Sequence, residues 1–174
     1  MTLFLLREQP DSVRRMTDAI DRLKTDIKYC KTCGNVSDAD ICEICASVNR
    51  DKSTVCVVKD FQDIIAIENT GQYSGVYHVL GGVISPMDGV GPDDININGL
   101  INRIADGGIN ELLFALSANM EGDTTAFYIT KKVANYQIKI TAISRGIAVG
   151  GELEYADEIT LGRSILNRTL YSGH

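Results

Sequence analysis

The chain has 174 residues, of which 44% are hydrophobic and 23% charged, with three prolines and a net charge of −6. This composition is that of an ordinary globular protein, and the length suffices for one domain or two small ones. No apolar run reaches the roughly 20 residues that a bilayer-spanning helix needs, so a transmembrane protein is excluded. Residues 1–6 lack the basic start of a signal peptide, and we therefore expect a cytoplasmic protein. The excess negative charge lies entirely in residues 51–174, which makes that part a poor partner for DNA phosphates.

An amphipathic helix is predicted over residues 10–29, within an N-terminal helical region that we assign to residues 1–29. Pro10, Asp11 and Ser12 are typical of a helix start. Apolar side chains then recur every three or four positions, at Val13, Met16, Ile20, Leu23 and Ile27. The opposite face is charged, and such a face is most often simply exposed to water.

Four of the five cysteines form two C-x2-C pairs that are separated by eight residues. They are Cys30, Cys33, Cys42 and Cys45. Two such pairs complete a tetrahedral Zn²⁺ shell with no open position, which indicates a structural zinc in a C4 zinc finger over residues 30–45. A redox C-x-x-C motif or two disulfides are the alternatives, and disulfides are disfavoured in a cytoplasm.

The pattern changes to alternating strands and helices after a polar linker predicted at residues 49–53. Short β-rich runs occupy residues 55–58, 75–80, 112–116 and 138–143. Helical stretches lie near residues 62–69, 93–105 and 124–135. This alternation predicts an α/β domain over residues 53–148, with a mostly parallel sheet covered by helices on both faces. Within its strands, Cys56 reads as a small buried hydrophobe, and His78 more often as a hydrogen-bonded structural histidine than as a base or ligand.

Two loops at strand ends are candidate functional regions, because ligands of parallel sheets bind beyond the carboxyl ends of the strands. The glycine-bearing loop at residues 80–92 either lines a site or packs as an Ω-loop. The second loop follows the third strand and contains Glu121, Gly122 and Asp123, before a helix that we expect to begin near Thr124.

A C-terminal arm is predicted over residues 149–174. Gly150 and Gly151 let the chain turn, and the following apolar side chains are expected to pack on a neighbouring protomer: Ile159, Leu161, Ile165 and Leu166. The chain contains no phosphate-binding Gly-x4-Gly-Lys-Ser/Thr loop, so a P-loop ATPase is excluded.

The loop after the third strand resembles that of Toprim domains, in which two aspartates and a glutamate hold Mg²⁺ for phosphoryl transfer. Carried over by position, the aspartates fall on Ser117 and Asn119, and only the glutamate is retained, as Glu121. The glutamate that ends the first Toprim strand falls on Lys59. A cation repels Mg²⁺, and metal-assisted phosphoryl transfer needs several converging carboxylates, so we predict a domain without catalytic activity.

The chain as a whole resembles the RecR family of recombination mediators, over about residues 3–170. Beyond the zinc knuckles, the resemblance is carried by YHVLGG at 77–82, SP at 85–86, GVGPDD at 89–94, EGDTTA at 121–126 and GIAVGGELEYAD at 146–157. It implies a non-catalytic DNA-repair protein that works with RecO, and often RecF, to help RecA load onto single-stranded DNA gaps. It also implies a clamp-like homo-oligomer, a dimer or a ring tetramer, that encircles DNA.

The N-terminal region departs from this family. The helix-hairpin-helix segment that the family uses to meet DNA phosphates has no counterpart before Leu3, as though about two dozen residues were missing through trimming or a shorter variant. We therefore expect weak DNA binding by this chain.

Two questions about the strand-end loop remain open from the sequence. A diverged metal-dependent phosphoryl-transfer enzyme could use Glu121 and Asp123 together with Asp60 and Asp63. In a non-catalytic protein, Glu121 and Asp123 offer an acidic patch for a basic partner, RecO under the resemblance. Alternatively, Glu121 merely interacts favourably with the dipole of the following helix.

Overall fold

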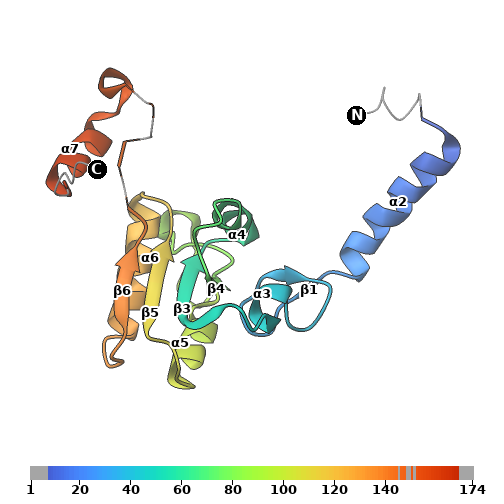
Figure 1. Ribbon diagram of the computed structural model, residues 1–174, viewed down its shortest axis with the longest axis horizontal. Coiled ribbons are helices and arrows are strands. Elements are labelled where there is room, and N and C mark those ends of the chain that lie inside the picture. The colour runs from blue at the N-terminus through green and yellow to red at the C-terminus, as the bar shows by residue number, and fades with distance from the viewer. Residues whose placement is uncertain (1–7, 145, 148–149, 151, 169–174) are drawn as a thin grey trace.

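The computed structural model describes residues 8–144, 146–147, 150 and 152–168. In chain order it contains an N-terminal helix, a small hairpin with the cysteines, a parallel sheet with its helices, and a C-terminal helix (Figure 1). The parts of the predicted N-terminal region and C-terminal arm that fall on residues 1–7, Val149, Gly151 and 169–174 lie outside the described residues. The overall class is the predicted one, α/β with a small cysteine-bearing module before the sheet.

The N-terminal helix α2 spans Pro10–Thr25 and projects away from the sheet (Figure 1). It ends four residues earlier than predicted, because Lys28 and Tyr29 form strand β1 (Lys28–Tyr29), which pairs antiparallel with β2 (Val36–Ser37). Its apolar stripe has no cover within the described part of the chain: the side chains of Met16 and Ile20 are 38% and 49% exposed.

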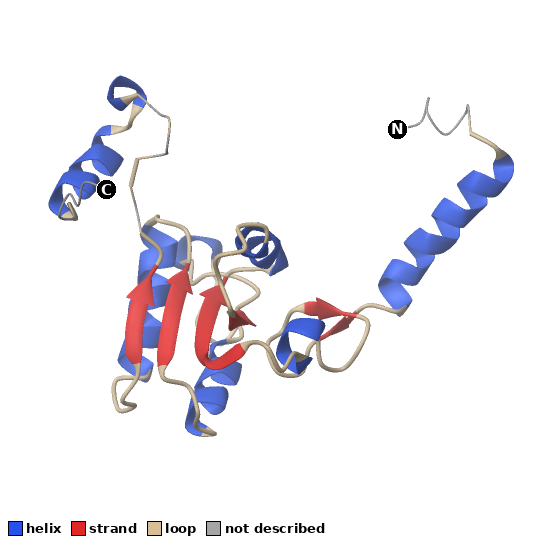
Figure 2. Ribbon diagram, viewed as in Figure 1, coloured by secondary structure: helices blue, strands red, loops and turns tan. Residues whose placement is uncertain are grey.

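The sheet contains four parallel strands in the order β4-β3-β5-β6, shown in red in Figure 2. Its strands are β3 (Asp51–Val58), β4 (Gly75–Val79), β5 (Glu111–Ala115) and β6 (Lys139–Ala142). The linker prediction at residues 49–53 is wrong in its second half, since β3 begins at Asp51, whose N–H bonds to the Ser74 carbonyl at 2.9 Å. Four consecutive fully buried residues at the end of β3, Val55 to Val58, give the central strand its two apolar faces.

Helices cover both faces of the sheet, as predicted. One face, presented by Val55, Val57 and Leu112 among others, packs on α5 (Ile97–Ala105) and α6 (Met120–Lys132). The other face, with Cys56, Val58 and Tyr77, packs on α4 (Phe61–Glu68) and on Ile44 of the short helix α3 (Glu43–Ala46). The cysteine-bearing module therefore supplies part of the cover of the sheet.

The last described elements are a 3-10 turn, η2 (Leu153–Tyr155), and helix α7 (Glu158–Leu166), which lie beyond the carboxyl end of the sheet in Figure 1. Asp157 caps α7 by accepting from the Thr160 N–H at 2.9 Å. No helix among the described residues is long and apolar enough to cross a membrane.

Candidate metal centre and strand-end site

The four cysteines of the two C-x2-C pairs converge on one point. Their Sγ atoms all lie within 4.8 Å of one another, and Cys33 Sγ and Cys42 Sγ are 3.6 Å apart. A tetrahedral ion with Zn–S distances of about 2.3 Å separates its sulfurs by about 3.8 Å, close to this arrangement. All four are free thiols and are at most 9% exposed, so neither predicted alternative, a pair of disulfides or an accessible redox motif, describes them.

The surroundings of the sulfurs fit a bound cation. Backbone N–H groups point at two of them, Cys42 N at 3.3 Å from Cys30 Sγ and Asn35 N at 3.5 Å from Cys33 Sγ. Burial raises the pKa of Cys42 to about 11, and the side-chain hydrogen bond with Cys45, followed by burial, raises that of Cys33. Burial acts in the same sense on Cys30, but backbone N–H groups outweigh it and lower its pKa to about 6. Four thiolates this close repel one another unless a cation lies between them, and a closed tetrahedral set of four thiolates is typical of structural Zn²⁺.

The metal module is fused to the edge of the sheet. The Cys33 carbonyl accepts a hydrogen bond from the Val79 N–H at 2.7 Å, at the end of β4. Gly34 has φ +76°, and a Cβ there would lie 3.2 Å from the Val79 carbonyl oxygen, so the close approach favours glycine. Asn96 completes the junction, since its side chain donates to that carbonyl at 3.3 Å.

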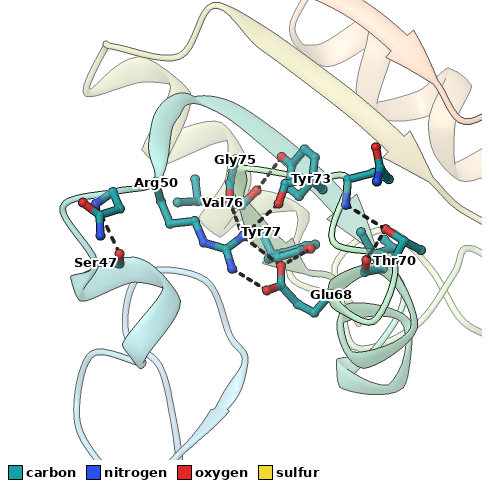
Figure 3. A network of polar contacts seen from close by, with 11 residues as sticks. Ser47, Arg50, Glu68, Thr70, Tyr73, Gly75, Val76 and Tyr77 are labelled. Carbon is teal, nitrogen blue, oxygen red and sulfur yellow. Dashed lines mark hydrogen bonds and ion pairs between the residues drawn. The ribbon is translucent and has the colours of Figure 1, made fainter.

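A polar network secures the chain where it leaves the metal module and enters β3 (Figure 3). The Arg50 guanidinium makes a two-pronged ion pair with Glu68 of α4, with one N–H···O distance of 2.8 Å, and also donates to the Tyr73 and Gly75 carbonyls. The Tyr77 hydroxyl donates to the same carboxylate at 2.6 Å. Sequence reasoning missed this network because Arg50 and Glu68 are 18 residues apart and Arg50 falls in a segment that reads as a linker.

The second candidate site, after β5, differs from its prediction in one respect. Helix α6 begins at Met120, so Glu121 and Asp123 lie in its first turn and not in a loop. Asn119 caps the helix by accepting from the Gly122 N–H at 2.9 Å. Gly122 packs so closely on the preceding turn that a Cβ would lie 2.1 Å from the Ser117 carbonyl oxygen. The glycine that suggests a loop is therefore required by tertiary contact.

The acidic residues near the strand ends are already engaged in local structure. Asp60 accepts from the Gln62 N–H at 2.8 Å, and Asp63 accepts from the N–H groups of Lys59 and Asp60 at 3.1 and 3.2 Å. Among the described residues, the cysteine cluster is the single group of three or more metal-ligating side chains whose ligand atoms converge. The carboxylates that a phosphoryl-transfer site would need are thus not brought together.

Helix α7 lies against this second site. Arg163 Nη2 and Asp123 Oδ2 are 3.8 Å apart, and both side chains are about two-fifths exposed. A groove of about 560 Å³ lies between the strand ends and α7, lined by Leu116, Ser117 and Ile143 on one side and Ile159 and Arg163 on the other. Glu121, in the same turn of α6, is half-buried.

Three single-residue or loop predictions can be compared with the structure. His78 is 1% exposed, its Nε2 lies 2.8 Å from the Asn96 carbonyl oxygen, and burial lowers its pKa to about 4, which confirms a structural histidine. Cys56 is fully buried, as predicted. The loop at 80–92 packs on α6, where the Ile84 N–H donates to Thr125 Oγ1 at 2.8 Å, and its first residues, Leu80 and Gly81, line a groove.

Comparison with known proteins assigns three consecutive parts of the chain. Residues 27–47 match the four-cysteine zinc finger domain of RecR, residues 53–144 the Toprim domain, and residues 146–169 the RecR C-terminal region. The protein named "Recombination protein RecR" of Bacteroides thetaiotaomicron is 57% identical over 173 residues, which are 99% of this chain and 84% of that protein. The proteins of the same name in Cytophaga hutchinsonii and Flavobacterium johnsoniae are 55% and 54% identical, over 98% and 97% of this chain and 84% and 82% of their own lengths.

A four-cysteine zinc finger joined to a Toprim domain that lacks its metal-binding carboxylates defines a non-catalytic nucleic-acid-handling protein. The chain belongs to the RecR family of recombination proteins, which act in recombinational DNA repair. RecR is a non-catalytic recombination mediator, so the alternative prediction of a phosphoryl-transfer enzyme is wrong. The cysteine cluster is the family's zinc finger, and Cys30, Cys33, Cys42 and Cys45 would hold its structural zinc.

Proposed function

We propose that this chain is a DNA clamp and adaptor that works with RecO, and with RecF as a further partner, to help RecA load onto single-stranded DNA gaps. The observation that supports an adaptor is the strand-end site. Lys59, Ser117 and Asn119 stand at positions where a catalytic Toprim domain has carboxylates, and Asn119 is committed to capping α6. In place of metal-binding carboxylates, this position carries the capped N-terminus of α6, which a partner protein can contact.

We assign the contact with RecO to the acidic first turn of α6, at Glu121 and Asp123. Negative charge at this strand–helix junction suits a basic partner surface. The same position at the helix N-terminus gives Glu121 a favourable interaction with the helix dipole, so substitutions must separate docking from stability.

The proposal is tested by titration calorimetry of RecO with Glu121→Ala and Glu121→Lys. Docking predicts that affinity falls, more for lysine than for alanine, while the melting temperature barely changes. Asp106→Lys, at an exposed position after α5, is the matched charge control and should keep wild-type affinity. Unchanged affinity for both Glu121 variants, with slightly lowered stability, would assign this residue to helix stabilisation alone.

Self-association is proposed to use the C-terminal arm. Ile159, Ile165 and Leu166 on α7 are 71%, 58% and 78% exposed, which leaves an apolar face that a second copy would bury in a dimer or ring tetramer. We accordingly divide the chain into an N-terminal helical region at 1–29, the zinc finger at 30–45, the Toprim domain at 53–148 and the arm at 149–174. Light scattering of Ile165→Asp against wild type tests the arm, with a loss of the larger species expected.

A cytoplasmic location is proposed on two grounds. The substrate of recombinational repair is chromosomal DNA, and the five cysteines of the chain are all free thiols, as reducing compartments favour.

A further inference from the structure

A second groove lies on the opposite side of the sheet from α7, between the zinc finger and the carboxyl ends of β3 and β4. Its volume is about 430 Å³. One part of its lining comes from the finger, through Tyr29, Gly34 and Val36, and another from the start of α4, through Phe61. The strand ends contribute Asp60, Val79, Leu80 and Gly81, and none of the four zinc-binding cysteines lines the groove.

Two exposed aromatic rings distinguish this groove. Tyr29 is 72% exposed and Phe61 is 43% exposed, and both line it although they come from segments 32 positions apart. Two exposed aromatic side chains that line one groove form a candidate binding surface.

Two glycines, Gly34 and Gly81, contribute to the lining of the groove. Gly34 packs against the Val79 carbonyl, and a Cβ at Gly81 would meet nothing within 4 Å, so the groove is open beside that residue. Beyond the carboxyl ends of parallel strands is also where ligands of α/β sheets bind. The groove thus offers flat apolar surfaces and open space at a position that suits a planar ligand.

Lysines adjoin both aromatic residues in the sequence. Lys28, which precedes Tyr29, and Lys31 both pair with Asp40, with Nζ–Oδ distances of 3.3 and 2.5 Å. The three side chains together carry a net charge of +1. Lys59, which follows β3 and precedes Phe61 by two positions, is exposed and forms no ion pair with any described residue. One carboxylate, that of Asp60, lines the groove; it and Asp63 accept hydrogen bonds from backbone N–H groups at the start of α4, where the helix dipole offsets their charge.

We propose that this groove binds a base of single-stranded DNA, which stacks on Tyr29 and Phe61 while Lys28, Lys31 and Lys59 contact the flanking phosphates. Aromatic rings with cations along a groove are the arrangement by which proteins hold single strands without sequence preference. An apolar peptide would use the rings but gain nothing from the lysines, so the surface favours DNA over a protein segment. The proposal deepens the proposed function, on which it rests, by giving the zinc finger a DNA contact.

The chain contains no tryptophan, which allows a direct optical test. In Phe61→Trp, a dT15 oligonucleotide should quench the single indole as a base stacks on it. Ile65→Trp, one turn further along α4 and 55% exposed, is the matched control outside the groove and should not respond. Fluorescence anisotropy of labelled dT15 on the same samples reports whether DNA is bound at all.

Alanine variants measure the contribution of stacking. Tyr29→Ala and Phe61→Ala should each weaken dT15 binding about 5- to 100-fold, the range that one base–aromatic stack spans. Tyr29→Phe and Phe61→Tyr should restore it, and Ile65→Ala should leave it unchanged. An abasic strand of the same length, which keeps the phosphates, should bind wild type about as weakly as dT15 binds the alanine variants.

Each result has one meaning. DNA binding without indole quenching, or with wild-type affinity in both alanine variants, overturns the groove while the proposed function stands. Loss of RecO binding in Tyr29→Ala with DNA binding intact makes the groove a protein surface and also overturns it. No DNA binding by the wild-type chain at any salt concentration removes the proposed DNA function and this inference together.

Discussion

The zinc finger and helix α7 flank the same sheet but are joined to it by different kinds of contact. The finger is joined by a backbone hydrogen bond from Val79 to Cys33, by Ile44 in the core, and by the half-buried pair of Arg50 and Glu68. The described part of α7 meets α6 through the partly exposed pair of Arg163 and Asp123. Backbone and buried contacts fix geometry, whereas an exposed ion pair contributes little. The finger side is built as one rigid unit with the sheet, whereas α7 leaves apolar side chains exposed.

Removal of the metal should have the largest effect on the finger side of the sheet. Cys42→Ser should lose zinc and unfold residues 30–46, since metal binding supplies most of the folding free energy of such small modules. The loss should spread to the end of β4, because the Val79 N–H loses its acceptor, while β5 and β6 stay protected in hydrogen exchange.

Cys56→Ala is the control for this prediction, since Cys56 is buried in the sheet and remote from the cluster in sequence. It should keep one equivalent of zinc. Protein freshly prepared without chelator that holds less than about half an equivalent would contradict the zinc site.

The pH dependence of stability gives the next largest effect, through His78. Burial lowers its pKa to about 4 from an unfolded value of 6.5, so the unfolded chain binds more protons between these limits. Stability is therefore fully present above pH 6.5 and is lost as pH falls toward 4, by about 2 kcal/mol at pH 5. Urea unfolding at pH 7 and pH 5 measures this, and His78→Phe should remove that part of the slope. An equal slope in both proteins would show that other groups carry it.

Removing the Arg50–Glu68 pair should weaken the junction of the zinc finger and the sheet by a smaller amount. Arg50→Ala should lower the free energy of unfolding by about 2 kcal/mol, because Glu68 and the Tyr73 and Gly75 carbonyls lose a donor in a half-buried site. The Arg50 pair and the Tyr77 hydroxyl hold the pKa of Glu68 below its usual value, so this contribution fades as pH falls through that range. Arg50→Met combined with Glu68→Leu should recover part of the loss, which denaturant unfolding can check.

The sequence predicted the parts of the fold that depend on local pattern. Cysteine spacing indicated the zinc finger, and runs such as residues 55–58 indicated the buried strands. The start of α6 was misplaced, because Gly122 reads as a loop residue until its contact with the Ser117 carbonyl is known. The Arg50–Glu68 pair and the groove of Tyr29 and Phe61 join residues 18 and 32 positions apart, and no local pattern relates such positions.

The smallest effect is expected at the junction of α7 with α6. Arg163→Ala removes an ion pair whose two side chains are about two-fifths exposed, and such pairs contribute at most about 1 kcal/mol. The free energy of unfolding should therefore fall by less than it does for Arg50→Ala. The loss caused by Arg163→Ala should shrink further in high salt, because exposed charges are screened. If α7 is instead fixed as firmly as the finger, Arg163→Ala will cost as much as Arg50→Ala and will do so at every salt concentration. Parallel urea titrations of the two variants at low and high salt decide between these outcomes. A difference that favours the finger side would mean that the position of α7 is set by what it binds and not by the sheet it adjoins.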